Sequence, residues 1–248
     1  MRRVAAAVAA GLLVCAGCGD AGVRAAGDGE PQLVATCGDV RFPGLPADAS
    51  SFPPLGAETS ELDLAATGGE AGVMDVEEWL VAERSEDRLV LFGRPSSAPE
   101  DPPFVDATFR REGDRWVPQG WGQCRIEVSS PGWGHARFVL DPDAEPTATS
   151  TGVAVLATER ACASGRTPGD REVRSVVAYE DDTEVHVVVL VEPSEGDQEC
   201  PGHPSFPFRV ELGSALAGRT VFDASRQPPF ERPWPPTASS LASQGDTA

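Results

Sequence analysis

The stretch at residues 173–191 limits the possible fold more than any other part of the chain. It reads VRSVVAYEDDTEVHVVVLV, which is two runs rich in valine on either side of the acidic triplet Glu180, Asp181 and Asp182. Branched apolar side chains are enriched in strands, and a short charged cluster between two such runs marks a turn. The stretch therefore predicts a β-hairpin.

Shorter apolar runs around charged turns recur on both sides of this hairpin. Residues 78–93 (EWLVAERSEDRLVLFG) and residues 104–117 (FVDATFRREGDRWV) predict two more hairpins. A helix over residues 72–84 is an alternative to the first of them, because its apolar residues also recur at helical spacing. Further strands are expected at residues 123–129, 135–140, 152–159, 208–212 and 219–223.

About ten short strands with this spacing predict a mostly β fold of antiparallel sheets, either sandwich-like or α+β. The domain is expected to span residues 36–225, and two halves that divide near residue 147 are an alternative to one unit. Residues 226–248 are rich in Pro and Ser, so we expect them to form a disordered tail.

The first 17 residues have the composition of a secretory signal peptide. Arg2 and Arg3 precede an apolar run over residues 4–14, and small residues follow it. Such a run suits the core of a signal peptide but is too short to span a bilayer, which needs about 20 residues. We therefore expect the chain to be exported and residues 1–17 to be removed.

The end of this segment resembles the lipobox of bacterial lipoproteins. It reads LLVCAGC and places Ala16 and Gly17 directly before Cys18. In that family the cysteine receives a diacylglycerol thioether, the chain is cut before it, and the new amine is acylated, for which we expect palmitate. The resemblance implies that Cys18 is the lipidated first residue of the mature chain. The chain departs from the family at Cys15, where Leu is usual, and plain secretion without a lipid is the alternative.

The implied location is the outer face of the cell membrane, with residues 18–35 as a lipidated cysteine and flexible tether. The chain has a formal net charge of −19 and loses two further positive charges with Arg2 and Arg3. Such a charge repels nucleic acid and anionic headgroups. Attachment to the membrane is therefore expected through the acyl chains on Cys18, each buried CH₂ contributing about 0.8 kcal/mol.

Four cysteines remain in the body of the chain: Cys37, Cys124, Cys162 and Cys200. An even number outside the membrane favours disulfides, and four cysteines allow three connectivities. We favour Cys37–Cys124 together with Cys162–Cys200, because each bridge then stays within its own half of the domain. The second pair also brackets the hairpin at residues 173–191.

The chain contains no recognised catalytic motif. HExxH, GxSxG and P-loop patterns are absent, and a chain without lysine cannot form a Schiff base. His186 is expected on the same strand face as Glu184, and such a pair can orient a base or bind a metal. We favour the alternative, a histidine that lies beside a carboxylate without a chemical role. No catalytic, cofactor-binding or metal-binding residue is therefore predicted.

An acidic stretch at residues 141–146 (DPDAEP) has carboxylates spaced as in some calcium loops. Two prolines stiffen it, and it lacks the glycine that an EF-hand loop requires. We expect an acidic connecting loop.

Three tryptophans, Trp116, Trp121 and Trp133, lie close to Cys124 in the sequence. Exposed tryptophans can stack on the sugar rings of a cell wall, whereas tryptophans in a small core pack against a disulfide. We expect the second arrangement.

Three further stretches resemble uncharacterised secreted or lipid-anchored proteins of high-GC Gram-positive bacteria. They are WVPQGWGQCR, ERACASG and CPGHPSFPFRVELGSALAGRTVFDAS, at residues 116–125, 159–165 and 200–225. The resemblance implies a fold, a location and disulfide-bonded cysteines, and no mechanism. Our leading hypothesis is a non-enzymatic, lipid-anchored module that binds a cell-envelope ligand or protein partner. The alternative is an extracellular hydrolase that uses dispersed carboxylates and His186.

Overall fold

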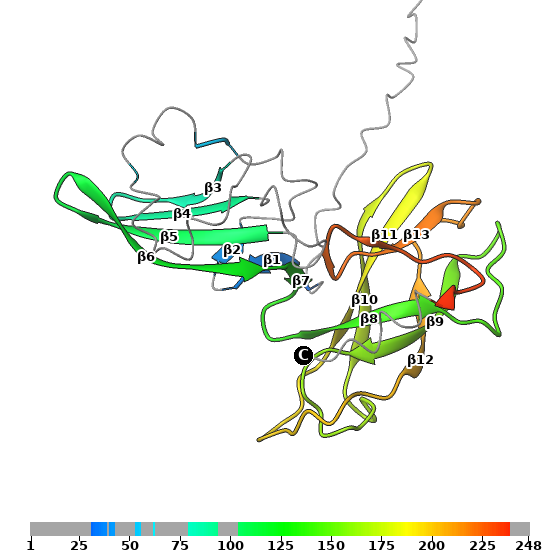
Figure 1. Ribbon diagram of the computed structural model, residues 1–248. Helices are drawn as coiled ribbons and strands as arrows, with labels where there is room; N and C mark the ends of the chain where they lie inside the picture. Colours follow the sequence, from blue (N-terminus) through cyan, green and yellow to red (C-terminus); the bar gives the residue numbers. More distant parts are fainter. Residues whose placement is uncertain are drawn as a thin grey trace, which may run out of the picture.

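The computed structural model describes residues 31–38, 40–42, 53–55, 62, 79–93 and 104–238. The fifteen elements assigned in these ranges are all β-strands (Figure 1). In chain order they are β1 (Val34–Cys37), β2 (Val40–Phe42), β3 (Leu80–Arg84), β4 (Arg88–Gly93), β5 (Phe104–Glu112), β6 (Arg115–Cys124), β7 (Ile126–Ser129), β8 (Gly134–Leu140), β9 (Gly152–Glu159), β10 (Val173–Glu180), β11 (Glu184–Val191), β12 (Phe206–Glu211), β13 (Thr220–Asp223), β14 (Arg226–Gln227) and β15 (Phe230–Glu231). The chain is therefore mostly β, as the sequence predicts.

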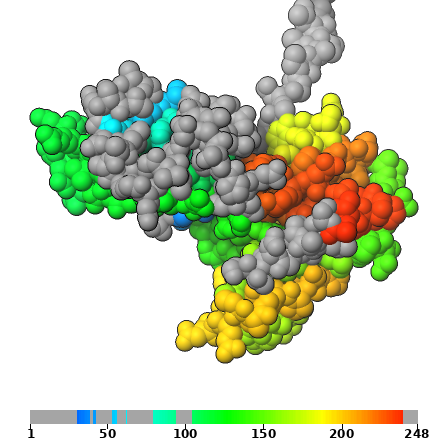
Figure 2. All heavy atoms as spheres, in the orientation of Figure 1, coloured from blue at the N-terminus to red at the C-terminus, as the bar shows by residue number. Residues whose placement is uncertain are grey.

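The strands form three sheets. The large sheet has seven strands in the order β12-β9-β8-β11-β13-β15, with β10 also paired to β11. The joint sheet has the order β14-β7-β1-β2, and the outer sheet has the order β3-β4-β5-β6. The joint and outer sheets lie on one side of Figure 1 and the large sheet lies on the other. Figure 2 shows the same two lobes with all atoms drawn.

Neighbouring strands in the described chain are antiparallel with one exception, β11 and β13, which run parallel. The three predicted hairpins are confirmed as β3–β4, β5–β6 and β10–β11. Residues 80–84 of the alternative helix form strand β3, and residues 72–78 lie outside the described residues.

Three apolar clusters stabilise the sheets. The central core contains residues from all three sheets, and β11 contributes Val188 and Leu190 to it. The inner core lies on the opposite face of the large sheet and receives Val187 and Val189 from the same strand. The outer core covers the second face of the outer sheet, around Phe109. Because successive side chains alternate between faces, a strand buried on both faces has an unbroken apolar run, as β11 does.

The two disulfides join the cysteines in the predicted pairs. Cys37–Cys124 links β1 to β6, with Cα atoms 5.3 Å apart, and its sulfur atoms lie within the central core. Cys162–Cys200 links the loops before and after the β10–β11 hairpin, with Cα atoms 4.7 Å apart. One bridge therefore fastens the joint sheet to the outer sheet, and the other fastens two loops of the large sheet.

The structure changes two expected boundaries. The chain passes between lobes at residues 130–133, between β7 and β8, and residue 147 lies in the loop from β8 to β9. The tether was expected to include Val34 and Ala35, but strand β1 begins at Val34 and Ala35 is fully buried. The signal segment and Cys18 lie outside the described residues.

The predicted disordered tail is wrong for residues 226–238. Strand β14 pairs with β7 and strand β15 pairs with β13. Arg232 is buried, and the Trp234 Nε1 donates a hydrogen bond of 3.1 Å to the carbonyl oxygen of Asp141. Side chains scattered among the prolines thus give this segment enough to bury, and residues 239–248 lie outside the described residues.

No helix in the described ranges combines the length and the apolar character that crossing a membrane requires.

Candidate functional site

His186 lies in the middle of an aromatic row across three strands. The register places it opposite Tyr179 of β10 and opposite Phe222 of β13. Its ring centroid lies 5.2 Å from that of Tyr179 and 4.8 Å from that of Phe222. Its Nε2 lies 3.2 Å from the Glu184 Oε1, close enough for a charge interaction but not aligned as a hydrogen bond. The structure thus brings together the histidine and the carboxylate that the sequence predicts on one face.

The surroundings of His186 favour its neutral form. Burial lowers its pKa, and the nearby carboxylate of Glu184 opposes this effect. A general base must lie within hydrogen-bond reach of the group whose proton it takes. The contacts of His186 among the described residues are the rings of Tyr179 and Phe222 and the carboxylate of Glu184, and none of these is a serine, threonine or cysteine that it could activate.

Asp181 fixes the tip of the β10–β11 hairpin. Its carboxylate accepts hydrogen bonds from the Tyr179 hydroxyl at 2.7 Å and from the Thr183 amide at 2.7 Å. The Thr183 hydroxyl and the Glu184 amide also donate to it, at 2.8 and 2.9 Å. Together these donors, the Tyr179 hydroxyl first, hold the pKa of Asp181 well below its usual range. The carboxylate is therefore the acceptor that closes a turn.

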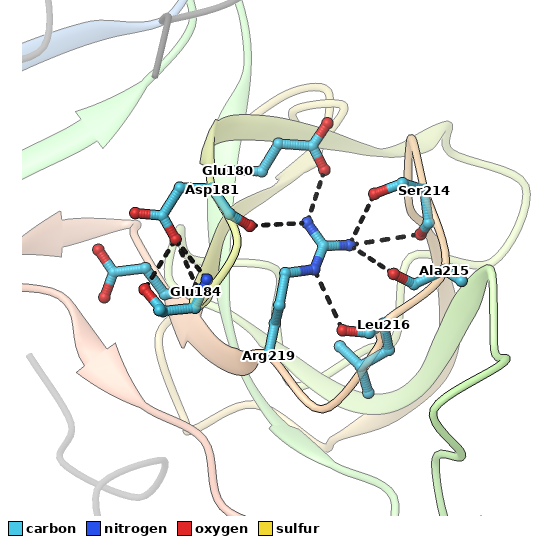
Figure 3. Close-up of polar contacts among 8 residues, drawn as sticks. Glu180, Asp181, Glu184, Ser214, Ala215, Leu216 and Arg219 are labelled. Atoms are coloured by element: carbon cyan, nitrogen blue, oxygen red, sulfur yellow. Dashed lines mark hydrogen bonds and ion pairs between the residues drawn. The ribbon is translucent and has the colours of Figure 1, made fainter. Parts of the chain in front are cut away.

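Arg219 connects that hairpin to the loop before β13 (Figure 3). Its Nη1 donates to the Glu180 Oε2 at 3.0 Å, and its side chain is only 5% exposed. The remaining guanidinium hydrogens go to the loop: Nε to the Leu216 carbonyl at 3.1 Å, and Nη2 to the Ala215 carbonyl and the Ser214 hydroxyl, both at 2.9 Å. The planar guanidinium group directs its N–H donors toward several carbonyl and hydroxyl oxygens of the loop at once. Arg219 therefore holds the loop in one conformation.

Two other buried carboxylates also bind arginine. The Glu159 carboxylate accepts two hydrogen bonds from Arg171, at 2.7 and 2.6 Å. The Asp223 Oδ2 accepts one of 2.7 Å from Arg232, and both side chains are almost fully buried. The Phe138 amide also donates to Asp223, at 3.2 Å. Breaking a buried pair leaves an uncompensated charge, so these carboxylates hold strands together.

A group of charged residues around His135 lies where the chain passes from β7 of the joint sheet to β8 of the large sheet. Burial lowers the pKa of His135, and the charges of Glu127 and Asp223 oppose this effect. Burial also lowers the pKa of Arg137, and the nearby charge of Arg160 adds to the decrease. The sequence did not predict this group, because its members come from β7, β8, β13 and the loop after β9.

The acidic loop at residues 141–146 forms a local turn. The Asp141 carboxylate accepts a hydrogen bond of 3.0 Å from the Asp143 amide. Across the described part of the chain, no three His, Cys, Asp or Glu side chains are grouped so that they could hold a metal ion. The carboxylates of this loop therefore do not form a metal site with one another.

The expected packing of tryptophan in the core around the disulfide holds for Trp133 and fails for Trp116 and Trp121. Trp116 packs against the outer core, and Trp133 packs against the central core. Trp121 is 36% exposed. The physical reason for Trp121 is strand alternation, because Cys124 follows it by three positions and the two side chains therefore lie on opposite faces of β6. Besides Trp133, three phenylalanines share the central core with the disulfide: Phe42, Phe92 and Phe104.

Comparison of the chain with models of known families, with curated proteins and with solved structures found no match. The geometry and the sequence signals alone must therefore support any function.

Proposed function

We propose that the chain is a lipid-anchored extracytoplasmic protein whose domain is a non-enzymatic binding module of the cell envelope. The observation that carries the proposal is the disulfide pairing, Cys37–Cys124 and Cys162–Cys200. Disulfides persist in oxidising compartments and are rare in the cytosol, so the pairing supports export.

The anchor follows from the cysteines outside those pairs. Cys15 lies in the segment that resembles a signal peptide, and Cys18 directly follows that segment. Small residues directly before Cys18 fit the lipobox, and the strongly negative chain needs an attachment other than charge. Acyl chains on Cys18 would supply it.

The state of the ionisable groups supports binding more than catalysis. A catalytic site needs a nucleophile, a base and an orienting group in mutual reach. In the described chain the buried carboxylates of Glu159 and Asp223 and the partly buried one of Glu180 bind arginines, and His186 lies between two rings. This arrangement stabilises the fold and gives the hydrolase alternative no assembled site.

Intact-mass spectrometry of the membrane fraction tests the proposal. The mature chain is expected to begin at Cys18 and to carry a diacylglyceryl group and an amide-linked acyl chain. Cys18→Ala should leave an uncleaved precursor or release the protein. Cys15→Ala is the matched control and should keep the anchor, because it changes only the discarded segment. A soluble mature form that begins at another residue in normally exported protein would refute the anchor.

A further inference from the structure

We propose that Trp121, on the edge strand β6, is a stacking platform for a neutral glycan of the cell envelope. This inference rests on the proposed binding function and names the chemical class of its ligand. Trp121 is the large apolar side chain that the described residues leave exposed, at 36%. A flat indole ring can cover the apolar face of a pyranose, while hydroxyl groups at the sugar's rim bond to polar neighbours.

The strand that carries Trp121 lies at the end of its sheet. The order of the outer sheet ends at β6, and Trp121 lies opposite the buried Ala107 of β5. On the other edge of β6, Leu62 forms an isolated bridge with Trp116, and no described strand pairs with the residues beyond it. The green rim of the left-hand lobe in Figure 2 contains the β5–β6 hairpin. A ligand can therefore approach the ring and the strand edge together.

Neither packing nor backbone conformation requires the glycines that flank Trp121, Gly120 and Gly122. A Cβ at Gly120 would meet no atom within 4 Å, and one at Gly122 would lie 3.4 Å from the Asp106 Oδ1, an ordinary contact. Neither glycine has a positive φ. Glycine within a strand weakens it, and one common reason for its presence is the close approach of a ligand to the backbone. Gly120 and Gly122 therefore weaken the strand on both sides of Trp121 although the packing does not require glycine at either position.

The charge of β6 matches a neutral ligand. Residues 116–123 (WVPQGWGQ) contain no charged side chain, although the chain as a whole carries −19. Amide side chains from Gln119 and Gln123 accompany the ring on this short stretch. Amides both donate and accept hydrogen bonds, which matches the hydroxyl groups of a sugar. Nucleic acid and anionic lipid would need positive charge here.

Two features argue against protein as the occupant. Pro118 lacks an N–H, and the register shifts between Thr108 and Phe109, so a bulge interrupts β6 at this point. Proline and bulges protect a sheet edge from pairing with a second chain. The area is also small: a whole tryptophan buries about 150–250 Å² and the 36% of Trp121 that is exposed offers less, whereas a stable protein interface buries about 800 Å² on each partner. The footprint fits one or two sugar rings.

Calorimetric titration of the purified full chain with chitotetraose, cellotetraose and mannotetraose tests the inference. At least one of these neutral oligosaccharides is expected to bind, and Trp121→Ala should weaken that binding about tenfold or more. The variant should remain folded with a thermal midpoint only moderately below that of the wild type, because 36% of the residue is already in water. Trp121→Phe should retain part of the affinity, since a smaller ring remains.

Trp116→Phe is the matched control, because that tryptophan lies on the same strand and packs against the outer core. It should leave the affinity for the oligosaccharide unchanged. Absence of binding to all three sugars, or equal affinity of Trp121→Ala and wild type, would overturn the inference. It would also be overturned if Trp121 were needed for binding to phosphatidylglycerol vesicles or for self-association in sedimentation instead. These results are independent of the lipid on Cys18, so failure here leaves the anchor untouched.

Discussion

The hairpins β10–β11 and β5–β6 begin from similar sequence patterns and end in opposite environments. In the first, β11 has strands on both sides and apolar cores on both faces. In the second, β6 lies at the end of its sheet and exposes Trp121. The tip of the first is held by Asp181 and Arg219, whereas the tip of the second is exposed. Apolar runs around a charged turn therefore predict a hairpin, but its neighbours decide whether it becomes core or surface.

The largest effect on the free energy of unfolding is expected from a substitution in the core strand β11, compared with one in the edge strand β6. Leu190 of β11 is fully buried in the central core. Leu190→Ala should lower the free energy of unfolding by about 2–5 kcal/mol, because it removes buried methyl groups and leaves a cavity. Trp121→Ala, although it deletes a larger side chain, should lower it by only about 1–2 kcal/mol, because 36% of the residue is already exposed. Urea unfolding followed by circular dichroism measures both, and equal losses would contradict the assignment of core and surface.

A second prediction concerns the two hairpin tips. Arg219→Ala should lower the free energy of unfolding by about 2–3 kcal/mol, because the buried guanidinium is lost and several partly buried acceptors, including the Glu180 carboxylate, lose their donor. Arg219→Lys should recover little of this, since an ammonium group lacks the planar fork. Arg111 is the control. Its Nε bonds to the exposed Gly113 carbonyl at 3.3 Å, so Arg111→Ala should cost less than about 1 kcal/mol in the same urea experiment. A similar loss for both alanine variants would show that burial does not separate the tips.

The hairpins were predictable because each is a local pattern, whereas the sheet order was not. The parallel pairing of β13 with β11 joins residues 184–187 to residues 220–223, and no local signal reports such a pairing. The buried pair of Asp223 and Arg232 was hidden for the same reason, since the arginine lies in a Pro-rich segment that composition alone marks as disordered. The candidate site was predicted in part: the His186 and Glu184 pairing follows from strand alternation, but the flanking ring of Phe222 comes from β13.

A third prediction concerns the pH dependence of stability, which we expect to arise from the two histidines of the large sheet, His135 and His186. The folded-state pKa values of His135 and His186 both lie below the ordinary value of 6.5, mainly because of burial. The unfolded chain then binds protons more readily than the folded chain, so stability is greatest above pH 6.5 and falls as the pH decreases below it. The urea midpoint should therefore decrease from pH 7.5 to pH 5.

The control for this effect is a double variant, His135→Gln with His186→Gln, which should flatten the pH dependence in that window. The hydrogen bonds to the Asp181 carboxylate do not interfere, because its pKa is lowered from 3.8 and its stabilising effect is lost only in stronger acid. An unchanged slope in the double variant would assign the pH dependence to other groups.

The smallest effect on the free energy of unfolding is expected from a substitution in β6. A Cβ at Gly120 would have no atom within 4 Å, and the residue lies in a strand, so a branched side chain there meets no obstacle. Gly120→Val should raise the free energy of unfolding by about 0.5–1 kcal/mol, because valine restricts the unfolded chain and favours the extended backbone. A matched change at Gly152 should do the opposite, since a Cβ there would lie 2.8 Å from the Val210 carbonyl oxygen. Thermal midpoints of Gly120→Val and Gly152→Val measure the difference. Stabilisation at Gly120 would mean that this glycine is kept for a reason other than folding, and destabilisation at both positions would place β6 under the same packing constraint as the large sheet.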